Sequence, residues 1–137
     1  MHYALRTVLT LTGIIIIALG LNVALGGIQT LGWQGADPFL EVTDPEIFAV
    51  RDNHVRFIAG VWMAVGLLMI LGATRLRQMR SILLTLVAMV FTGGVMRLSA
   101  ADTGVLYSMD IAPSLIAELV LFPILGWWIF VATHRPI

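Results

Sequence analysis

The sequence contains no cysteine and no lysine, and it carries little charge of either sign. The absence of cysteine excludes disulfide bonds, thiol catalysis and thiolate metal ligands. Charged residues make up 12% of the 137 residues, about half of the roughly 25% that is usual in soluble domains. Hydrophobic residues make up 59%. This combination predicts a membrane protein.

The sequence also lacks the residue patterns that are typical of several classes of functional site. The eight basic residues, all arginine, are scattered and not interleaved with aromatic residues, so we expect no nucleic-acid partner. His2 and His134 lie near the ends and His54 stands alone, so we expect no metal site and no haem. No phosphate-binding glycine loop, Ser-His-Asp set or nucleophile motif is present. The sequence therefore leaves enzymatic activity uncertain, with the balance against it.

Four apolar segments are long enough to cross a bilayer, which takes about 20 helical residues. Helices are favoured because a continuous helix satisfies its own backbone hydrogen bonds in lipid. We predict an all-α integral membrane protein, one domain over residues 1–137 that forms a four-helix bundle, with spans at about 6–28, 52–74, 81–101 and 112–133. In an alternative interpretation the first segment is a cleaved signal peptide, since Arg6 precedes its apolar run.

The placement of charge predicts how these spans are oriented. Basic residues lie in the tails and in the connection between spans two and three, at Arg6, Arg75, Arg77, Arg80 and Arg135. Acidic residues lie in the other connections, at Asp37, Glu41, Asp44, Glu46, Asp52, Asp102 and Asp110. Because arginine-rich loops stay on the cytoplasmic side, both termini are expected in the cytoplasm.

The connection from Gln29 to Arg51 is the longest one. Trp33 in this connection suits the membrane interface. The stretch "TDPEIF" predicts a helix start, with Thr43 or Asp44 as the cap and Pro45 in the first turn. We expect a short interfacial helix here, separate from the second span or continuous with it, which covers the outer mouth of the bundle or acts as a lid.

One strong polar residue per span lies at a similar depth below the outer membrane boundary. At 1.5 Å per helical residue these depths are between about 4.5 and 7.5 Å. The residues are Asn22, Arg56, Arg97 and Glu118. Charged groups at such depth face the interior of a bundle, pair with each other or reach a water-filled cavity. This common depth makes them the candidate site.

The spacing of charges predicts two ion pairs. Asp52 and Arg56 are four residues apart with the acid first, which is the favoured order on a helix. Arg97 and Glu118 are expected to pair across neighbouring helices as a bidentate fork. The pairs are either structural or part of a binding site.

Four further interpretations concern single residues of this set and its surroundings. Arg56 and Arg97 are also close enough to the membrane interface to snorkel, with their head groups in phosphate or water. Asn22 favours an interhelical hydrogen bond over ligand contact. Trp62 either forms the floor of a pocket or is ordinary packing. Pro123 removes a hydrogen bond to Leu119 and predicts a kink beside Glu118.

Three stretches carry a resemblance to a known family: "DNHVRFIAGVWMAVGLLMI", "GGVMRLSAADTG" and "PSLIAELVLFPILGW". They look like small bacterial four-span proteins of domain-of-unknown-function family 4345, a group that is similar to the DoxX/DoxD-like membrane proteins. The shared pattern is an Arg-Phe pair followed by Gly, then Gly-Gly-x-x-Arg, then Glu followed by Pro. It falls on Arg56, Phe57, Gly60, Gly93, Gly94, Arg97, Glu118 and Pro123.

The resemblance implies a multi-pass protein of the bacterial cytoplasmic membrane. The sequence departs from the family pattern at one position, where Val105 follows Gly104 in place of the expected proline. This departure affects the shape of the outer loop. DoxD-like relatives are associated with quinone-linked oxidation of sulfur compounds. No redox residue in this sequence supports a transfer of that activity.

Three hypotheses for function follow from these patterns. The leading one is that the protein binds an amphiphile (a lipid, quinone or isoprenoid) with its head group against Arg97, Glu118 and Arg56, and needs no cofactor beyond such a bound lipid or quinone. The second is a non-catalytic accessory or assembly subunit, which contacts the bilayer and either a membrane-protein partner or further copies of itself. The third is a membrane-embedded isomerase that uses Glu118 as acid or base.

Overall fold

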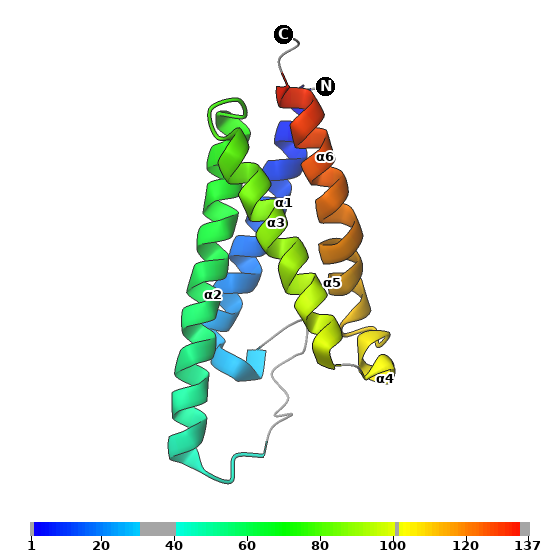
Figure 1. Ribbon diagram of the computed structural model, residues 1–137. Coiled ribbons are helices and arrows are strands. Elements are labelled where there is room, and N and C mark those ends of the chain that lie inside the picture. Colours follow the sequence, from blue (N-terminus) through cyan, green and yellow to red (C-terminus); the bar gives the residue numbers. More distant parts are fainter. Residues whose placement is uncertain (1, 31–40, 101, 135–137) are drawn as a thin grey trace. The chain divides into compact units, whose positions relative to one another are not determined.

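The computed structural model describes residues 2–30, 41–100 and 102–134, and in these ranges it is helical without any strand (Figure 1). Helical segments long and apolar enough to cross a membrane are found four times in this described part: His2–Thr30, Pro45–Thr74, Arg80–Arg97 and Ala112–Thr133. The predicted all-α membrane class is therefore confirmed.

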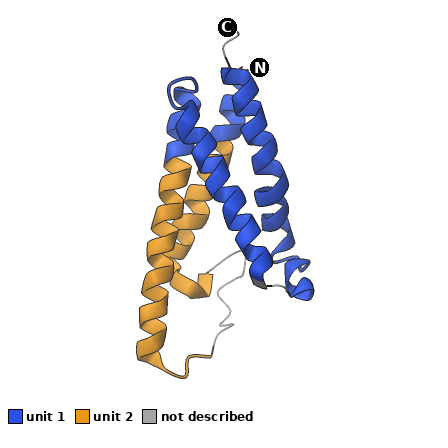
Figure 2. Ribbon diagram, viewed as in Figure 1, with its two compact units in different colours: residues 1–10, 68–137 blue, residues 11–67 orange. Residues whose placement is uncertain are grey.

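The chain divides into two compact units (Figure 2). Unit 1 comprises residues 1–10 and 68–137, and unit 2 comprises residues 11–67. Helices α1 (His2–Gly26) and α2 (Pro45–Thr74) run through both units, and the 3-10 turn η1 (Gly27–Thr30) belongs to unit 2. Unit 1 also holds α3 (Arg80–Arg97), η2 (Leu98–Ala100), α4 (Thr103–Leu106), α5 (Ala112–Ile116), the π-helical turn η3 (Ala117–Leu121) and α6 (Phe122–Thr133).

In unit 2, α1 and α2 pack closely because small residues line their contact. A Cβ atom at Gly66 would lie 2.6 Å from the backbone oxygen of Gly13. A Cβ atom at Gly20 would lie 2.9 Å from the backbone oxygen of Ala59. Close approach of backbones at small residues is the usual way in which membrane helices associate, since lipid supplies no hydrophobic drive between them.

In unit 1, α3 packs antiparallel to the segment formed by η3 and α6. Arg80 at the start of α3 lies 4.8 Å from the ring centroid of Phe130 near the end of α6. Between the ends, buried apolar side chains form the core: Leu83, Leu86, Val90, Leu125 and Ile129. The first turns of α1, the turn between α2 and α3, and the end of α6 lie at one end of this unit, and α4 and α5 lie at the other (Figures 1 and 2).

Helix α2 starts where the sequence predicts. The Asp44 carboxylate accepts hydrogen bonds from the backbone N–H groups of Glu46 and Ile47, both at 3.0 Å, and Pro45 is the first helical residue. From there the helix continues without a break to Thr74, so a separate short interfacial helix is not confirmed. The prediction that placed Trp33 at the membrane interface lies outside the described residues.

The fourth apolar segment widens to a π-helical turn ahead of Pro123. The backbone N–H of Phe122 bonds to the carbonyl oxygen of Ala117, five residues earlier. Pro123 has no N–H, so the usual bond to Leu119 is lost and the backbone ahead of it must find another arrangement. The structure thus has a π-helical turn that contains Glu118 itself, and the kink expected at Pro123 stays a prediction.

Candidate functional site

Arg97 and Glu118 form a bidentate ion pair inside unit 1. The Arg97 Nε donates to Glu118 Oε2 at 2.7 Å, and Arg97 Nη2 donates to Glu118 Oε1 at 2.9 Å. Parallel bonds of this kind are among the strongest and most directional polar contacts in proteins. The fork expected from the sequence is present, and it joins the end of α3 to η3.

The two partners of this pair differ in exposure. The Glu118 side chain is 12% exposed and that of Arg97 is 40% exposed. Both carboxylate oxygens of Glu118 are engaged, whereas Arg97 Nη1 makes no hydrogen bond to any residue in the described ranges. The pair therefore presents one donor edge of a guanidinium outward while the carboxylate faces inward.

Two glycines beside Arg97 have opposite surroundings. A Cβ atom at Gly94 would lie 2.7 Å from the Cβ of Glu118, so the absence of a side chain here is what lets η3 approach α3. A Cβ atom at Gly93 would meet no atom of the described residues within 4 Å. Gly93 is one helical turn before Arg97, so open space adjoins the arginine along α3.

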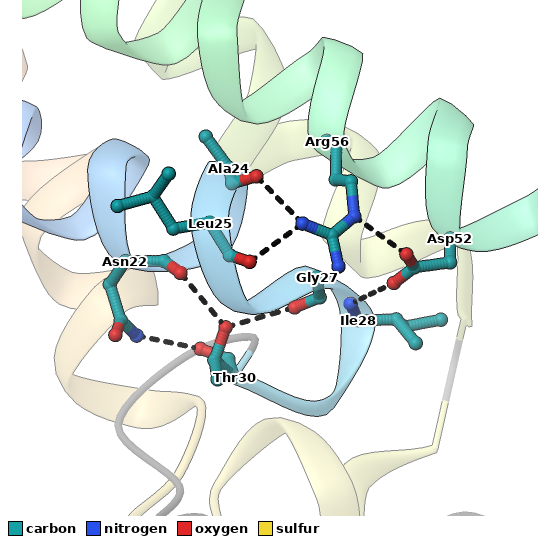
Figure 3. Close-up of polar contacts among 8 residues, drawn as sticks. All are labelled: Asn22, Ala24, Leu25, Gly27, Ile28, Thr30, Asp52 and Arg56. Atoms are coloured by element: carbon teal, nitrogen blue, oxygen red, sulfur yellow. Dashed lines mark hydrogen bonds and ion pairs between the residues drawn. The ribbon is translucent and has the colours of Figure 1, made fainter.

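Asp52 and Arg56 form the second ion pair, inside unit 2 (Figure 3). Arg56 Nε donates to Asp52 Oδ2 at 2.6 Å, and Arg56 Nη1 donates to the backbone oxygens of Ala24 at 3.0 Å and Leu25 at 2.7 Å. The other carboxylate oxygen of Asp52 accepts from the backbone N–H of Ile28 at 2.7 Å. Through this pair, α2 is hydrogen-bonded to the C-terminal end of α1.

The end of α1 needs such partners because no N–H donor inside the helix reaches its last carbonyl oxygens. Gly27 follows the helix with φ 74°, a left-handed conformation that glycine adopts without steric cost. Arg56 then bonds two of the last helical carbonyls, and Asp52 holds the amide just beyond the turn. The hydrogen bonds of this ion pair in the described residues therefore all lie at the end of α1.

Asn22 makes its hydrogen bond to η1, the turn that follows α1. Its side-chain nitrogen donates to the Thr30 backbone oxygen at 3.0 Å, and the Thr30 hydroxyl lies within hydrogen-bond distance of the backbone oxygens of Asn22 and Gly27. The expected interhelical hydrogen bond is therefore wrong in its partner: Asn22 ties η1 back onto α1. Its amide is close enough in sequence to reach the 3-10 turn that follows its own helix.

Residues 4–129 match a protein family that is described as a domain of unknown function (DUF4345). The chain belongs to this family. No curated protein and no solved structure matches it. The eight residues of the Arg-Phe, Gly-Gly and Glu-Pro pattern lie within this matched range. The DoxX/DoxD relationship stays a prediction.

This DUF4345 chain therefore distributes the sequence-predicted residues over two local polar sites. Arg97 and Glu118 belong to unit 1, whereas Asn22, Asp52 and Arg56 belong to unit 2. Trp62 is a half-buried residue of α2 in unit 2. A ligand-binding role for any of these residues stays a prediction.

Some residues of the DUF4345 chain take part in these sites without being expected from the sequence. Thr30 and the carbonyls of Ala24 and Leu25 complete the Asp52–Arg56 pair and the end of α1. The one available signal was the Gly26-Gly27 step at the end of the first apolar segment, which is typical of a helix C-terminus.

Proposed function

We propose that the protein binds an amphiphilic molecule of the membrane (a lipid, quinone or isoprenoid) whose polar head accepts a hydrogen bond from Arg97. The observation that carries this proposal is an available donor on the Arg97 guanidinium. Its Nε and Nη2 donate to Glu118, and Nη1 has no partner among the described residues. The role of Glu118 is to hold the arginine in place and to balance its charge.

The surroundings of Arg97 support an amphiphile over a fully polar ligand. Met96 and Leu98 on either side of it are exposed by 59% and 45%, and Leu121 of η3 is exposed by 58%. The open space at Gly93 gives an apolar tail room to lie along α3. A ligand with an acceptor head and a hydrocarbon tail therefore matches both the polar edge and the apolar surface.

The other two hypotheses receive less support. An isomerase needs a carboxyl group free to exchange a proton with its substrate, and both oxygens of Glu118 are occupied by Arg97. An accessory subunit needs a partner protein, so this hypothesis gains support only if a second protein copurifies. The Asp52–Arg56 pair is assigned a structural part, because its contacts close the end of α1.

The test compares the lipids that copurify with four forms of the protein in mild detergent: wild type, Arg97→Gln, Arg97→Lys and the control Arg51→Gln. Arg51 is an exposed arginine of α2, outside the pair. Mass spectrometry is expected to show one amphiphile enriched over the bulk membrane extract in wild type and Arg51→Gln only. Arg97→Lys keeps the charge but loses the planar fork, so it controls for loss of folding.

Identical lipid profiles in all four folded proteins would overturn this proposal. A second protein present in stoichiometric amount with wild type and with Arg97→Gln alike would support the accessory-subunit hypothesis in its place. Native gel migration of the same samples separates these two results.

We also propose that the protein lies in the bacterial cytoplasmic membrane with both termini in the cytoplasm. The support is the arginine distribution. Because the chain has no cysteine, single cysteines at Tyr3 and Met109, which are 87% and 82% exposed, can be labelled selectively. A membrane-impermeant maleimide should label Met109→Cys in spheroplasts and Tyr3→Cys only after lysis. The reverse order would contradict the orientation.

A further inference from the structure

The end of unit 1 opposite to the Arg97–Glu118 pair contains an open cavity of about 700 Å³. Its walls come from the first turns of α1 and from the turn between α2 and α3 (Figure 1). The charged and polar residues that line it include His2, Arg6, Thr74, Arg75 and Arg77. The buried side chain of Leu76 also contributes to the lining.

The shape of this cavity is held by well-packed neighbours. Leu5 and Leu9 of α1 are fully buried, and Leu76 and Met79 of the turn are buried as well. The turn is closed by a hydrogen bond from the Met79 N–H to the Arg75 carbonyl at 2.9 Å. The guanidinium groups around the cavity therefore project from backbone that is anchored in the core of unit 1.

The cavity concentrates positive charge. Among the described residues, no acidic side chain lines it and none of its three arginines forms an ion pair. All acidic residues of unit 1 belong to its other end, at Asp102, Asp110 and Glu118. Like charges that share a concave site repel each other, so an anion placed among them is stabilised.

Two further features favour a phosphate group that is attached to lipid. The cavity lies where apolar helices end, and Leu71, one turn before Thr74 on α2, is 44% exposed. Tyr3, which also lines the cavity, is 87% exposed and is of the residue type that gathers at membrane interfaces. Basic pockets between membrane helices are a known way of holding anionic lipid head groups.

We propose that this cavity binds the phosphate group of an anionic phospholipid, with Arg6, Arg75 and Arg77 as its ligands. Arginine suits this role because its fork can donate two bonds to a phosphate. The N-terminal end of α1 adds a partial positive charge on the same side. This site is separate from the amphiphile site proposed at Arg97, so either proposal can fail without the other.

The experiment measures phospholipid retention by native mass spectrometry of detergent-purified protein. Wild type is compared with Arg75→Gln/Arg77→Gln, with Arg6→Gln, and with the control Arg51→Gln. The probes are phosphatidylglycerol, phosphatidylcholine and inorganic phosphate. Each arginine removed from the cavity is expected to weaken phosphatidylglycerol binding about fivefold, the factor that corresponds to roughly 1 kcal/mol per basic residue at an anionic membrane surface. Arg51→Gln should bind as wild type does.

A second variant tests the cavity without removing an arginine. Gln78 lines the cavity and is exposed, so Gln78→Glu adds a negative charge there with little effect on folding. It should weaken phosphatidylglycerol binding and leave phosphatidylcholine binding unchanged. Thermal unfolding of each variant checks that the fold is intact.

Three results would overturn the proposal. The first is equal retention of phosphatidylglycerol and phosphatidylcholine by wild type. The second is a loss in Arg51→Gln as large as in the cavity variants, which would mean a diffuse surface effect. The third is complete displacement of phosphatidylglycerol by millimolar inorganic phosphate, which would assign the cavity to a soluble phosphate compound.

Discussion

Gly94 of α3 lies directly against Glu118 of η3, so that a Cβ atom at Gly94 would fall 2.7 Å from the Cβ of the glutamate. At the neighbouring Gly93, a Cβ atom would have no atom within 4 Å in the part of the chain that the structure describes. Two adjacent glycines in one helix therefore have opposite tolerance for a side chain. The approach that Gly94 permits brings the Glu118 carboxylate within reach of Arg97.

Replacing Gly94 by alanine should destabilise the protein, whereas Gly93→Ala should not. Forcing a methyl group into the contact with η3 costs on the order of 1–3 kcal/mol. Gly93→Ala is the matched control, since it alters the same helix and is expected to be neutral or stabilising by up to about 1 kcal/mol. Thermal unfolding in detergent, followed by circular dichroism, measures both. Equal changes in Tm for the two variants would contradict the contact.

Neutralising the two members of the Arg97–Glu118 pair should have unequal effects. Arg97→Gln leaves the largely buried Glu118 without a partner, which is the costly case. Glu118→Gln leaves an arginine that is 40% exposed and can turn toward lipid head groups. The free energy of unfolding is therefore expected to fall more in Arg97→Gln.

The double variant Arg97→Gln/Glu118→Gln completes a thermodynamic cycle. Its loss should be smaller than the sum of the two single losses, with a coupling of roughly 0.5–3 kcal/mol. Partial exposure of Arg97 places the coupling below that of a fully buried pair. Additive losses would mean that the two side chains do not interact in the purified protein.

Removing the Asp52 carboxylate should loosen the end of α1. In Asp52→Ala the backbone N–H of Ile28 loses its acceptor and Arg56 loses its counterion. A hydrogen bond to a charged group contributes about 1.5–3 kcal/mol, so amide exchange around Ile28 should become much faster. Hydrogen–deuterium exchange with mass spectrometry in nanodiscs measures this. Arg51→Gln serves as the control, and unchanged protection in Asp52→Ala would refute the capping role.

Gly27→Ala should destabilise unit 2 more than Gly60→Ala does. Gly27 has φ 74°, and the left-handed conformation costs an L-residue with a side chain about 1–2 kcal/mol. A methyl group there would also collide with Asp52 and Arg56, whereas one at Gly60 would meet none of the described residues within 4 Å. The difference in Tm between the two variants is the measurement. A Tm for Gly27→Ala at or above that of Gly60→Ala would show that the turn is free to rearrange.

Part of the polar chemistry could be predicted from spacing and depth. The Asp52–Arg56 pair follows from the four-residue spacing on one helix face. The Arg97–Glu118 pair follows from the scarcity of partners for a carboxylate in an apolar segment. The helix start at Pro45 follows from Asp44, whose side chain accepts the first free amides.

Other contacts could not be predicted because they depend on backbone geometry. Asn22 was expected to bond another helix, but η1 turns back and places the Thr30 carbonyl beside it. Arg56 bonds carbonyls 31 and 32 residues earlier in the chain, which no local pattern encodes. The cavity at the start of α1 is likewise invisible in the sequence, where Arg6 and Arg75 are simply distant basic residues.

The amino-acid sequence alone predicts a helical membrane protein, because apolar length and internally satisfied backbone bonds leave few alternatives in lipid. It also determined which charges needed partners. The packing of the folded chain sets which of Gly93 and Gly94 faces a neighbour, and which groups bond to the carboxylates of Asp52 and Glu118. Those contacts depend on how the packed helices are rotated and how closely they approach each other. Side-chain packing sets both, and the hydropathy pattern encodes neither.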